Sequence, residues 1–587
     1  MKRIRREFQK IYYNLDKILL LFASSFAFME FIWIPLNSWL AEALLSLTGH
    51  AYLSPTNALA VFSENGFVTL LFLLLFVANI FVAYLELALL FTGVWQLLDQ
   101  NVKHLPDYLR DVSRSMLAIL RHISLPKLIF LLFYAVILLP FLRRLLNIYY
   151  FNKLVIPEFV VDYLTNILLV GLLFLIALLV FFWLASRLMY AIPKVYFEHR
   201  SVKESIRYSW DKTSGRNQVG HFFSLIGIIL QSTLLFFLSG LCFYTVQVLV
   251  ERFVPGLAYP MVIVHYVLLR LAFYSAIALF MTKFVTLVTG KHLPSYRRKR
   301  LRHRLRLAIV ATASLYYGIQ GAVTFYYPLE TLPITISHRG VDNANGVQNT
   351  LDSLEKTAQL SPDFVEMDIQ ETKDLEFVVM HDTDLQALTG NPGGTHDYTL
   401  AELTKMTASE NGMSSPVPSF DAYLDKADQL GQKLLVEIKV TDQDSPDLTK
   451  TFLEKYGQRL LDKGHQIQSL DYQTIIEVKE YDEALVSFFI LPFNSIYPQT
   501  LADGYTMEYS SLDQNFMVKS WLHGKSVYAW TPNDEETMTQ MILLQVDGII
   551  TDQLAVMQDL MKNFQENTSY SDLFLIQFQK LLYQFEG

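Results

Sequence analysis

The chain has 587 residues, of which 52% are hydrophobic and 14% aromatic; its mean hydropathy is +0.27 and its formal net charge is -8. A chain this long and this apolar is not expected to fold as one soluble domain, so membrane-spanning segments are predicted. Its single cysteine, Cys242, excludes an intramolecular disulfide and a cysteine-rich metal site.

Seven apolar stretches in the first half of the chain are long enough to cross a bilayer, which takes about 20 residues. The basic N-terminus runs into the first stretch without a clean small-residue cleavage site, so we interpret that stretch as a retained span rather than a signal peptide. We therefore predict a multi-span α-helical membrane domain over residues 1–328. The predicted spans are 17–45, 67–97, 126–145, 161–189, 219–250, 259–289 and 305–327.

Lysine and arginine are concentrated in alternate loops of this domain. The N-terminus and the loops 98–125, 190–218 and 291–304 are basic, whereas 46–66 contains neither residue type. Basic loops are typically cytoplasmic, so the N-terminus is predicted to face the cytoplasm. An odd number of spans then places everything after about residue 328 outside the cytoplasm.

Ionisable residues within the predicted spans are candidates for function. Glu86 lies in the second span, and His265 and Arg270 lie in the sixth. A pair of Glu86 and Arg270 would line a path for a lipid or solute, or would be a neutralised contact between helices. The loop segments 103–122 and 194–210 have amphipathic patterns and are predicted to lie on the inner membrane surface.

From residue 331 on, short apolar runs alternate with helical patterns. Such alternation is typical of parallel strands connected by helices, and eight runs fit a (β/α)8 barrel of the TIM type. We predict this α/β barrel over residues 331–565 and a C-terminal helical tail over 566–587. The runs are ITIS, FVEMDI, FVVMH, KLLVEIK, HQIQSL, SFFIL, SVYAW and DGIITD.

The carboxyl ends of these runs carry chemically active side chains, and in such barrels the reactive groups come from those ends. Alternate residues of a strand share a side, so Glu366 and Asp368 are expected to face one mouth, as are Glu437 and Lys439. The candidate site residues are His338, Arg339, Glu366, Asp368, His381, Glu437, Lys439 and Trp530.

Three converging carboxylates without cysteine suit one hard divalent cation, Mg²⁺ or Ca²⁺, better than zinc. Two nearby histidines are suited to act as base and acid, and Arg339 and Lys439 are suited to hold an anion. Each feature alone has a structural explanation, such as a packed histidine or a solvated strand face. Their occurrence in this order on successive strands favours a catalytic site.

The segment 334–555 resembles the glycerophosphodiester phosphodiesterase family through the motifs HRG, VEMD, VVMHD, VEIK, YAWTPN and VDGIITD. The N-terminal half is similar to the multi-span domain joined to some bacterial members. The resemblance implies a (β/α)8 barrel that cleaves glycerophosphodiesters to glycerol phosphate and an alcohol. It implies that the substrate's own glycerol hydroxyl attacks phosphorus and that water then opens the resulting cyclic phosphate.

The resemblance also implies a role for each motif residue. Glu366, Asp368 and Glu437 are expected to bind the cation, and His338 and His381 to form the acid/base pair. Arg339 and Lys439 are expected to contact the substrate phosphate, and Trp530 to line the substrate pocket. One position departs from the family, because Gln348-Asn349-Thr350 stands where Glu-Asn-Thr is usual. This change removes one negative charge from the mouth.

We therefore predict a multi-pass protein of a bacterial cell membrane whose catalytic domain is extracellular. Its expected substrate is a glycerophosphodiester or a lipid-linked glycerophosphate. The alternatives are a phosphatidylinositol-type phospholipase C and a non-catalytic phosphodiester-binding barrel.

The second half lacks a basic patch, which argues against nucleic-acid binding. The long segment 382–430 is expected to form a lid or substrate wall. The sequence leaves the oligomeric state open.

Overall fold

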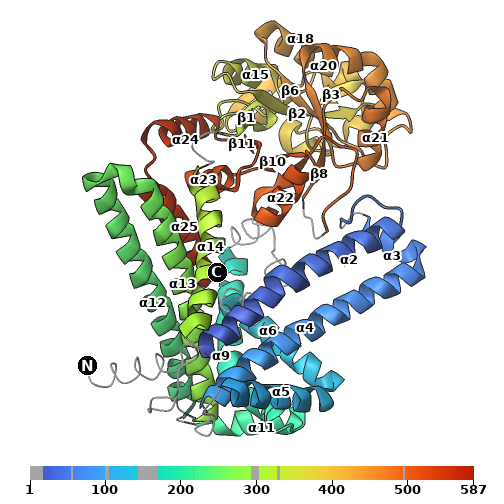
Figure 1. Ribbon diagram of the computed structural model, residues 1–587. Helices are drawn as coiled ribbons and strands as arrows, with labels where there is room; N and C mark the ends of the chain where they lie inside the picture. The colour runs from blue at the N-terminus through green and yellow to red at the C-terminus, as the bar shows by residue number, and fades with distance from the viewer. Residues whose placement is uncertain are drawn as a thin grey trace. The chain divides into compact units, whose positions relative to one another are not determined.

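A computed structural model describes residues 17–54, 57–98, 105–142, 168–215, 217–291, 303–326, 331–492 and 496–586 (Figure 1). The chain divides into two compact units, and each is described by itself. The membrane unit consists of Met1–Thr48, Phe62–Phe325 and Ser569–Gly587. The barrel unit consists of Gly49–Val61 and Tyr326–Thr568, so it includes a short segment from the first quarter of the chain.

Long apolar helices make up the membrane unit. Six helical stretches in the described residues are long and apolar enough to cross a membrane. A further helix, α6 (Leu125–Leu142), covers most of the predicted span 126–145, whose last residues lie outside the described part of the chain. The count of seven spans therefore stays a prediction. The six stretches are residues 17–47, which include η1 (Met29–Trp33) and α2 (Ile34–Leu47), α4 (Gly66–Leu98), α9 (Leu168–Leu188), α12 (Asn217–Phe253), α13 (Ala258–Thr289) and α14 (His303–Tyr326).

Shorter helices complete this unit. The amphipathic segments form α5 (Leu105–Arg121), α10 (Ala191–Tyr196) and α11 (Val202–Lys212). The C-terminal helix α25 (Tyr570–Glu586) packs on α12 and α13, where the ring centroids of Phe578 and Phe236 are 5.5 Å apart. A Cβ atom at Gly240 would overlap the Phe578 ring, so glycine permits this close approach.

The proposed pairing of Glu86 with Arg270 is not among the contacts of the described residues. Glu86 accepts a hydrogen bond of 3.3 Å from the Ser25 hydroxyl, and Arg270 donates two hydrogen bonds to the Tyr266 hydroxyl on its own helix. The expectation was wrong because a sequence does not show which faces of two helices meet.

Eight parallel strands form the closed barrel of the second unit, which confirms the predicted fold. Their order around the ring is β1-β11-β10-β9-β8-β7-β6-β2, and pairing of β1 with β2 closes it. The strands are β1 (Ile334–Ser337), β2 (Phe364–Glu371), β6 (Leu434–Ile438), β7 (Gln466–Ser469), β8 (Ser487–Leu491), β9 (Gly504–Glu508), β10 (Ser526–Trp530) and β11 (Gly548–Thr551).

One of the eight predicted runs is not a barrel strand. The run FVVMH forms β3 (Phe377–Val379), which pairs antiparallel with the end of β2. Only five residues separate the two strands, which is too short for a parallel crossover. The missing member of the ring is β9, whose sequence GYTME alternates between Tyr505 and Met507 on one face and small or polar residues on the other. Such alternation is weaker than a continuous apolar run.

Helices cover the outside of the barrel. Several begin at a side chain that caps a free backbone N–H, as Ser419 does for α18 and Asp471 does for α21. The covering helices are α15 (Leu351–Ala358), α18 (Phe420–Leu430), α19 (Leu448–Phe452), α20 (Gln458–Lys463), α21 (Tyr472–Tyr481), α22 (Gln514–Leu522), α23 (Glu535–Leu544) and α24 (Leu554–Asn567).

The segment before α18 forms a small layer of its own. It carries α16 (Gln386–Thr389), η5 (Thr395–Asp397), α17 (Leu400–Leu403) and the hairpin of β4 (Thr407–Glu410) and β5 (Met413–Pro416). Its apolar residues, among them Leu385, Leu403 and Val417, pack with Val347 and Val378 in a separate core.

An apolar layer fills the inside of the barrel and defines which side chains point inward. Six strands contribute to it, with the Phe488 and Tyr528 rings stacked at 4.0 Å. Because strand side chains alternate, the next inward position lies two residues further along each chain. The layer consists of Ile336, Phe364, Leu435, Phe488, Tyr528 and Ile550, and two residues beyond them lie His338, Glu366, Glu437, Ile490, Trp530 and Asp552. The candidate residues thus sit directly above the barrel core.

Candidate active site

Three carboxylates come together at the mouth of the barrel. Glu366 and Asp368 on β2 and Glu437 on β6 are buried, and one oxygen of each lies within 4.8 Å of the others. Gln468 on β7 lies beside them, with its Nε2 atom 3.3 Å from Glu366 and 3.4 Å from Glu437. The structure therefore confirms the predicted convergence of the carboxylates of the two strands.

Burial and neighbouring charges shift the pKa values of the carboxylates in different directions. Burial raises the pKa of Glu366 well above its usual range, and Asp368 and Glu437 add to this effect. Burial also opposes ionisation of Asp368, but Lys439, His381 and Arg339 lower the pKa of Asp368 below its usual range. One ionised and one proton-retaining carboxylate side by side is what excess negative charge produces in a buried site.

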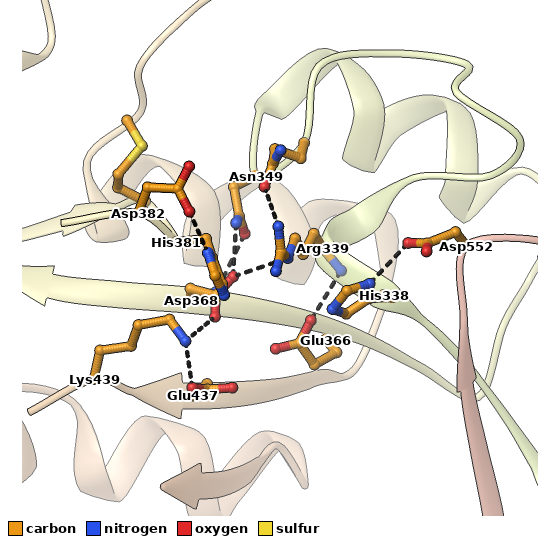
Figure 2. A network of polar contacts seen from close by, with 12 residues as sticks. His338, Arg339, Asn349, Glu366, Asp368, His381, Asp382, Glu437, Lys439 and Asp552 are labelled. Carbon is orange, nitrogen blue, oxygen red and sulfur yellow. Dashed lines mark hydrogen bonds and ion pairs between the residues drawn. The ribbon is translucent and has the colours of Figure 1, made fainter. Parts of the chain in front are cut away.

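Lys439 partly balances this charge. Its ammonium group donates to Glu437 at 2.5 Å and lies 3.1 Å from Asp368 (Figure 2). Burial disfavours the ammonium form, but the two carboxylates outweigh burial and raise the pKa of Lys439. Lys439 is thus a fixed positive charge at the end of β6.

His338 stands at the end of β1 and is held by a carboxylate from the last strand. Its Nδ1 atom lies 2.7 Å from Asp552, which follows β11. Asp552 in turn accepts a 2.7 Å hydrogen bond from the Asn533 side chain. Asp552 fixes the imidazole ring through Nδ1 and makes no bond to the Nε2 atom.

His381 follows β3 and has an equivalent partner in its neighbour Asp382, at 2.6 Å from Nδ1. Burial lowers the pKa of His381, and Lys439 and Arg339 lower it further, although Asp368 opposes them. Figure 2 shows the two histidines on either side of the Arg339 side chain. Both rings thus have a carboxylate at Nδ1, and no described residue bonds the Nε2 atom of either ring.

The turn after β1 aims Arg339 at the carboxylates. Arg339 has a φ of 52° and Gly340 a φ of 68°, in the left-handed region that glycine tolerates best. A Cβ atom at Gly340 would lie 2.7 Å from the Tyr423 hydroxyl. The Arg339 backbone N–H donates to Glu366 at 2.9 Å, and its guanidinium lies 3.9 Å from Asp368. Gly340 therefore makes possible the tight exit from the first strand.

Asparagine and glutamine side chains continue this network. Asn349 donates to Asp368 at 2.8 Å and accepts from the Asp368 backbone at 3.2 Å. The neighbouring Gln348 accepts a 2.7 Å hydrogen bond from the Arg339 guanidinium and donates to Glu410 of β4 at 2.9 Å. Gln348 is therefore bonded to Arg339 and Glu410.

The donor set fits a divalent cation. The three carboxylates supply only oxygen ligands, and Gln468 Oε1 is buried without a hydrogen-bond partner next to two of them. Three acidic groups against Lys439 and Arg339 leave excess negative charge. Buried like charges of this kind are costly unless a cation binds them.

All eight predicted residues lie at this mouth, including Trp530, which packs at the upper edge of the interior layer. Sequence reasoning missed Asp552, Asn533, Asp382, Gln468 and Glu410. The signal for Asp552 was present, since it ends the strand DGIITD in the same way that His338 ends the first one. Glu410 carried no such signal, because it lies in the inserted hairpin.

Two family models match the chain, one over its membrane part and one over its barrel. Residues 4–319 match the family model described as the membrane domain of glycerophosphoryl diester phosphodiesterase, and residues 338–556 match the glycerophosphoryl diester phosphodiesterase family. A putative glycerophosphodiester phosphodiesterase of Bacillus subtilis, YhdW, is 24% identical over 37% of this chain and 93% of its own length. A glycerophosphodiester phosphodiesterase of Caldanaerobacter subterraneus is 25% identical over the same shares.

Solved structures similar to the barrel include two bacterial proteins. A putative glycerophosphoryl diester phosphodiesterase of Silicibacter pomeroyi is 19% identical, with a TM-score of 0.37 over 41% of this chain and 97% of its own. An Oleispira antarctica phosphodiesterase, solved with the product sn-glycerol-3-phosphate, is 21% identical, with a TM-score of 0.36 over 39% of this chain and 97% of its own.

Proposed function

Because the chain belongs to the glycerophosphoryl diester phosphodiesterase family, whose membrane-domain model matches more than half of it, we propose that it hydrolyses glycerophosphodiesters by two-histidine catalysis at the outer face of the membrane. It is a multi-pass membrane protein, and its enzyme class is that of the phosphoric diester hydrolases. The products are glycerol phosphate and an alcohol.

The two histidines perform the proton transfers. His381, buried near Lys439 and Arg339, is favoured in its neutral form and takes the proton from the attacking glycerol hydroxyl at Nε2. His338, whose Nδ1 atom lies 2.7 Å from Asp552, gives a proton to the leaving alcohol. The roles reverse when water opens the cyclic phosphate.

Arg339 and Lys439 hold the phosphate. Both are anchored by the carboxylates of β2 and β6, so they enter the reaction already oriented. Fixed positive groups stabilise the charge that develops on the phosphate oxygens at little cost in reorganisation. Trp530 lines the pocket that receives the rest of the substrate.

Glu366, Asp368 and Glu437 are proposed to bind one divalent cation, Mg²⁺ or Ca²⁺. When bound, the cation would supply Lewis-acid stabilisation of phosphate oxygen charge. The three carboxylates lie on strands β2 and β6, which pair with each other, so the proposed ligands are held by paired backbone rather than by loops.

An outward-facing barrel is supported by the alternation of basic loops. The loops 98–125, 190–218 and 291–304 carry most of the lysine and arginine, which favours the cytoplasmic side for all three, although Arg143, Arg144 and Lys153 fall on the predicted outer side. An enzyme tied to the outer face meets substrates held in the membrane more often than soluble ones, because tethering raises their effective concentration. A lipid-linked glycerophosphate is therefore the proposed natural substrate class.

The observation that carries this proposal is the convergence of three buried carboxylates with two carboxylate-held histidines at one barrel mouth. The test is glycerol phosphate release from glycerophosphocholine by purified full-length protein, with and without a chelator. We expect activity that is lost with chelator and restored by Mg²⁺ or Ca²⁺. Full activity after exhaustive chelation would contradict metal dependence, and no hydrolysis of any glycerophosphodiester in the presence of cation would contradict the function.

A further inference from the structure

In the described part of the chain, one face of the barrel lacks the helix that covers the others. Each other pair of successive barrel strands is connected through at least one helix, but residues 492 and 496–503, the described part of the connection from β8 to β9, contain none. Phe489 of β8 points outward here and belongs to an apolar cluster with Tyr497, Tyr505 and Phe516. Such a cluster needs a cover, because a contiguous apolar surface is unfavourable when it is exposed to water.

Residues 49–61, which connect the first two membrane helices, provide that cover. The Tyr52 ring packs edge-on against Phe489 at 4.7 Å and against Tyr472 at 5.7 Å. The Gln499 backbone N–H donates to the Ala51 carbonyl at 2.7 Å. Asn57 holds the segment in shape, since its side chain bonds both the Tyr52 carbonyl and the Ser54 N–H.

We infer that residues 49–61 are an integral part of the barrel and that the chain crosses the membrane an even number of times between this segment and β1. Both parts belong to one compact unit, so they lie on the same side of the membrane. Six long helices are described between them: α4, α6, α9, α12, α13 and α14. Without α6, the described helices would make five crossings, an odd number that would place the segment and the barrel on opposite sides. Among the described helices, α6 is the one that makes this number even, and the contact therefore favours α6 as a membrane span.

A disulfide across this contact tests the inference in the full-length protein. Cysteines replace Ala51 and Gln499 in a Cys242→Ser background, and membranes are treated with a mild oxidant. The backbone hydrogen bond brings the two residues within disulfide range, so we expect the linked peptides in mass spectrometry. The control pair is Ala51→Cys with Leu375→Cys, because Leu375 is exposed beside β2, three strands from β8 in the ring. No link is expected there.

Absence of the Ala51–Gln499 disulfide overturns the inference. A second measurement labels each single-cysteine variant with an impermeant thiol reagent added on either side of the membrane. Labelling of both positions from one side supports the even count of crossings. Labelling from opposite sides overturns it, and would mean that α6 does not cross.

A second observation concerns Gln348, which stands where the family resemblance gives glutamate. The missing negative charge lies next to it on Glu410, which accepts hydrogen bonds from the Gln348 side chain at 2.9 Å and from its backbone at 3.1 Å. On its other side, Gln348 Oε1 accepts from the Arg339 guanidinium at 2.7 Å. With both ends of the amide occupied, Gln348 has one preferred orientation and connects Glu410 to Arg339.

We propose that Glu410 is a positioning residue that orients Arg339 through Gln348. This proposal rests on the function proposed above, in which Arg339 contacts the substrate phosphate. Glu410 lies on the β4–β5 hairpin, so the inserted segment reaches the phosphate site through this connection. A glutamate at position 348 would set two carboxylates against each other, which explains why the two positions carry one charge between them.

The test compares Gln348→Glu, Glu410→Gln and the double variant in the full-length protein. Each single variant should raise the KM for glycerophosphocholine roughly threefold to tenfold, the effect of losing about one hydrogen bond, with kcat less affected. The double variant exchanges the amide and the carboxylate and should return KM to within about twofold of the wild type. A double variant no better than Gln348→Glu overturns the proposal.

Binding of glycerol 3-phosphate, measured by calorimetry, separates this proposal from the proposed function. If the wild type hydrolyses no glycerophosphodiester, the function fails, whereas weaker product binding in both single variants and recovery in the double still supports the positioning role. Equal binding by all four proteins overturns it.

Discussion

Asp552→Ala removes the carboxylate that holds His338, and we expect kcat to fall by roughly 10- to 150-fold. The Nδ1 to Asp552 distance is 2.7 Å, and Asp552 is itself fixed by Asn533. A hydrogen bond to a charged group contributes about 1.5–3 kcal/mol, and each 1.36 kcal/mol is a factor of ten in rate. Loss of the carboxylate leaves Nδ1 without this partner, so the imidazole ring of the general acid is no longer held in position.

The assay is glycerol phosphate release from glycerophosphocholine at saturating substrate and cation. Asp552→Asn should recover part of the rate, because its amide oxygen still accepts from Nδ1–H. Asp559→Ala, which removes an exposed carboxylate from nearby α24, is the matched control and should leave kcat unchanged. In a His338→Ala background, Asp552→Ala should add less than about a twofold loss, since the two residues act as a unit. A folded Asp552→Ala enzyme within about twofold of the wild type would refute the reasoning.

The other predictions concern the catalytic pair, the cation and the topology. His338→Ala and His381→Ala should each lower kcat by at least about 100-fold, the lower end for losing a general acid or base; near-normal rates in either folded variant would exclude that role. Cation affinity, measured by calorimetry, should weaken as the pH falls, because the raised pKa of Glu366 makes protons compete with the ion, and Glu366→Gln should bind it far more weakly. In a Cys242→Ser background, Asn345→Cys should react with an impermeant thiol reagent on intact cells and Ser295→Cys should not; the reverse pattern would invert the membrane orientation.

The parts of the site that follow from strand position were predictable from the sequence. Inward positions repeat every two residues, so the ends of the apolar runs already placed Glu366, Asp368 and Glu437 at one mouth. The identity of the eight barrel strands was less predictable. FVVMH has the apolar character of a strand but too short a connection to be parallel, and GYTME is a barrel strand despite its polar face.

What depends on long-range contact was not predictable from one sequence. Glu410 lies 62 residues from Gln348, and nothing in the hairpin sequence indicates that it faces the barrel mouth. The pairing of Glu86 with Arg270 failed for the same reason, since helix faces are fixed by packing. The cover of β8 by Tyr52 is the extreme case, because it joins a segment from the first quarter of the chain to a strand near the other end of the chain.

The cover that residues 49–61 give to the face between β8 and β9 has a consequence for synthesis. Tyr52 leaves the ribosome about 440 residues before Phe489, which at ~5–20 residues per second is a delay of roughly 20 to 90 s. During that time the first membrane hairpin is already in place and its connecting segment waits without its partner. The catalytic domain can complete its outer core only if that hairpin was inserted in the correct orientation. An error in the insertion of the first membrane hairpin would therefore cause misfolding of the barrel, which is synthesised later.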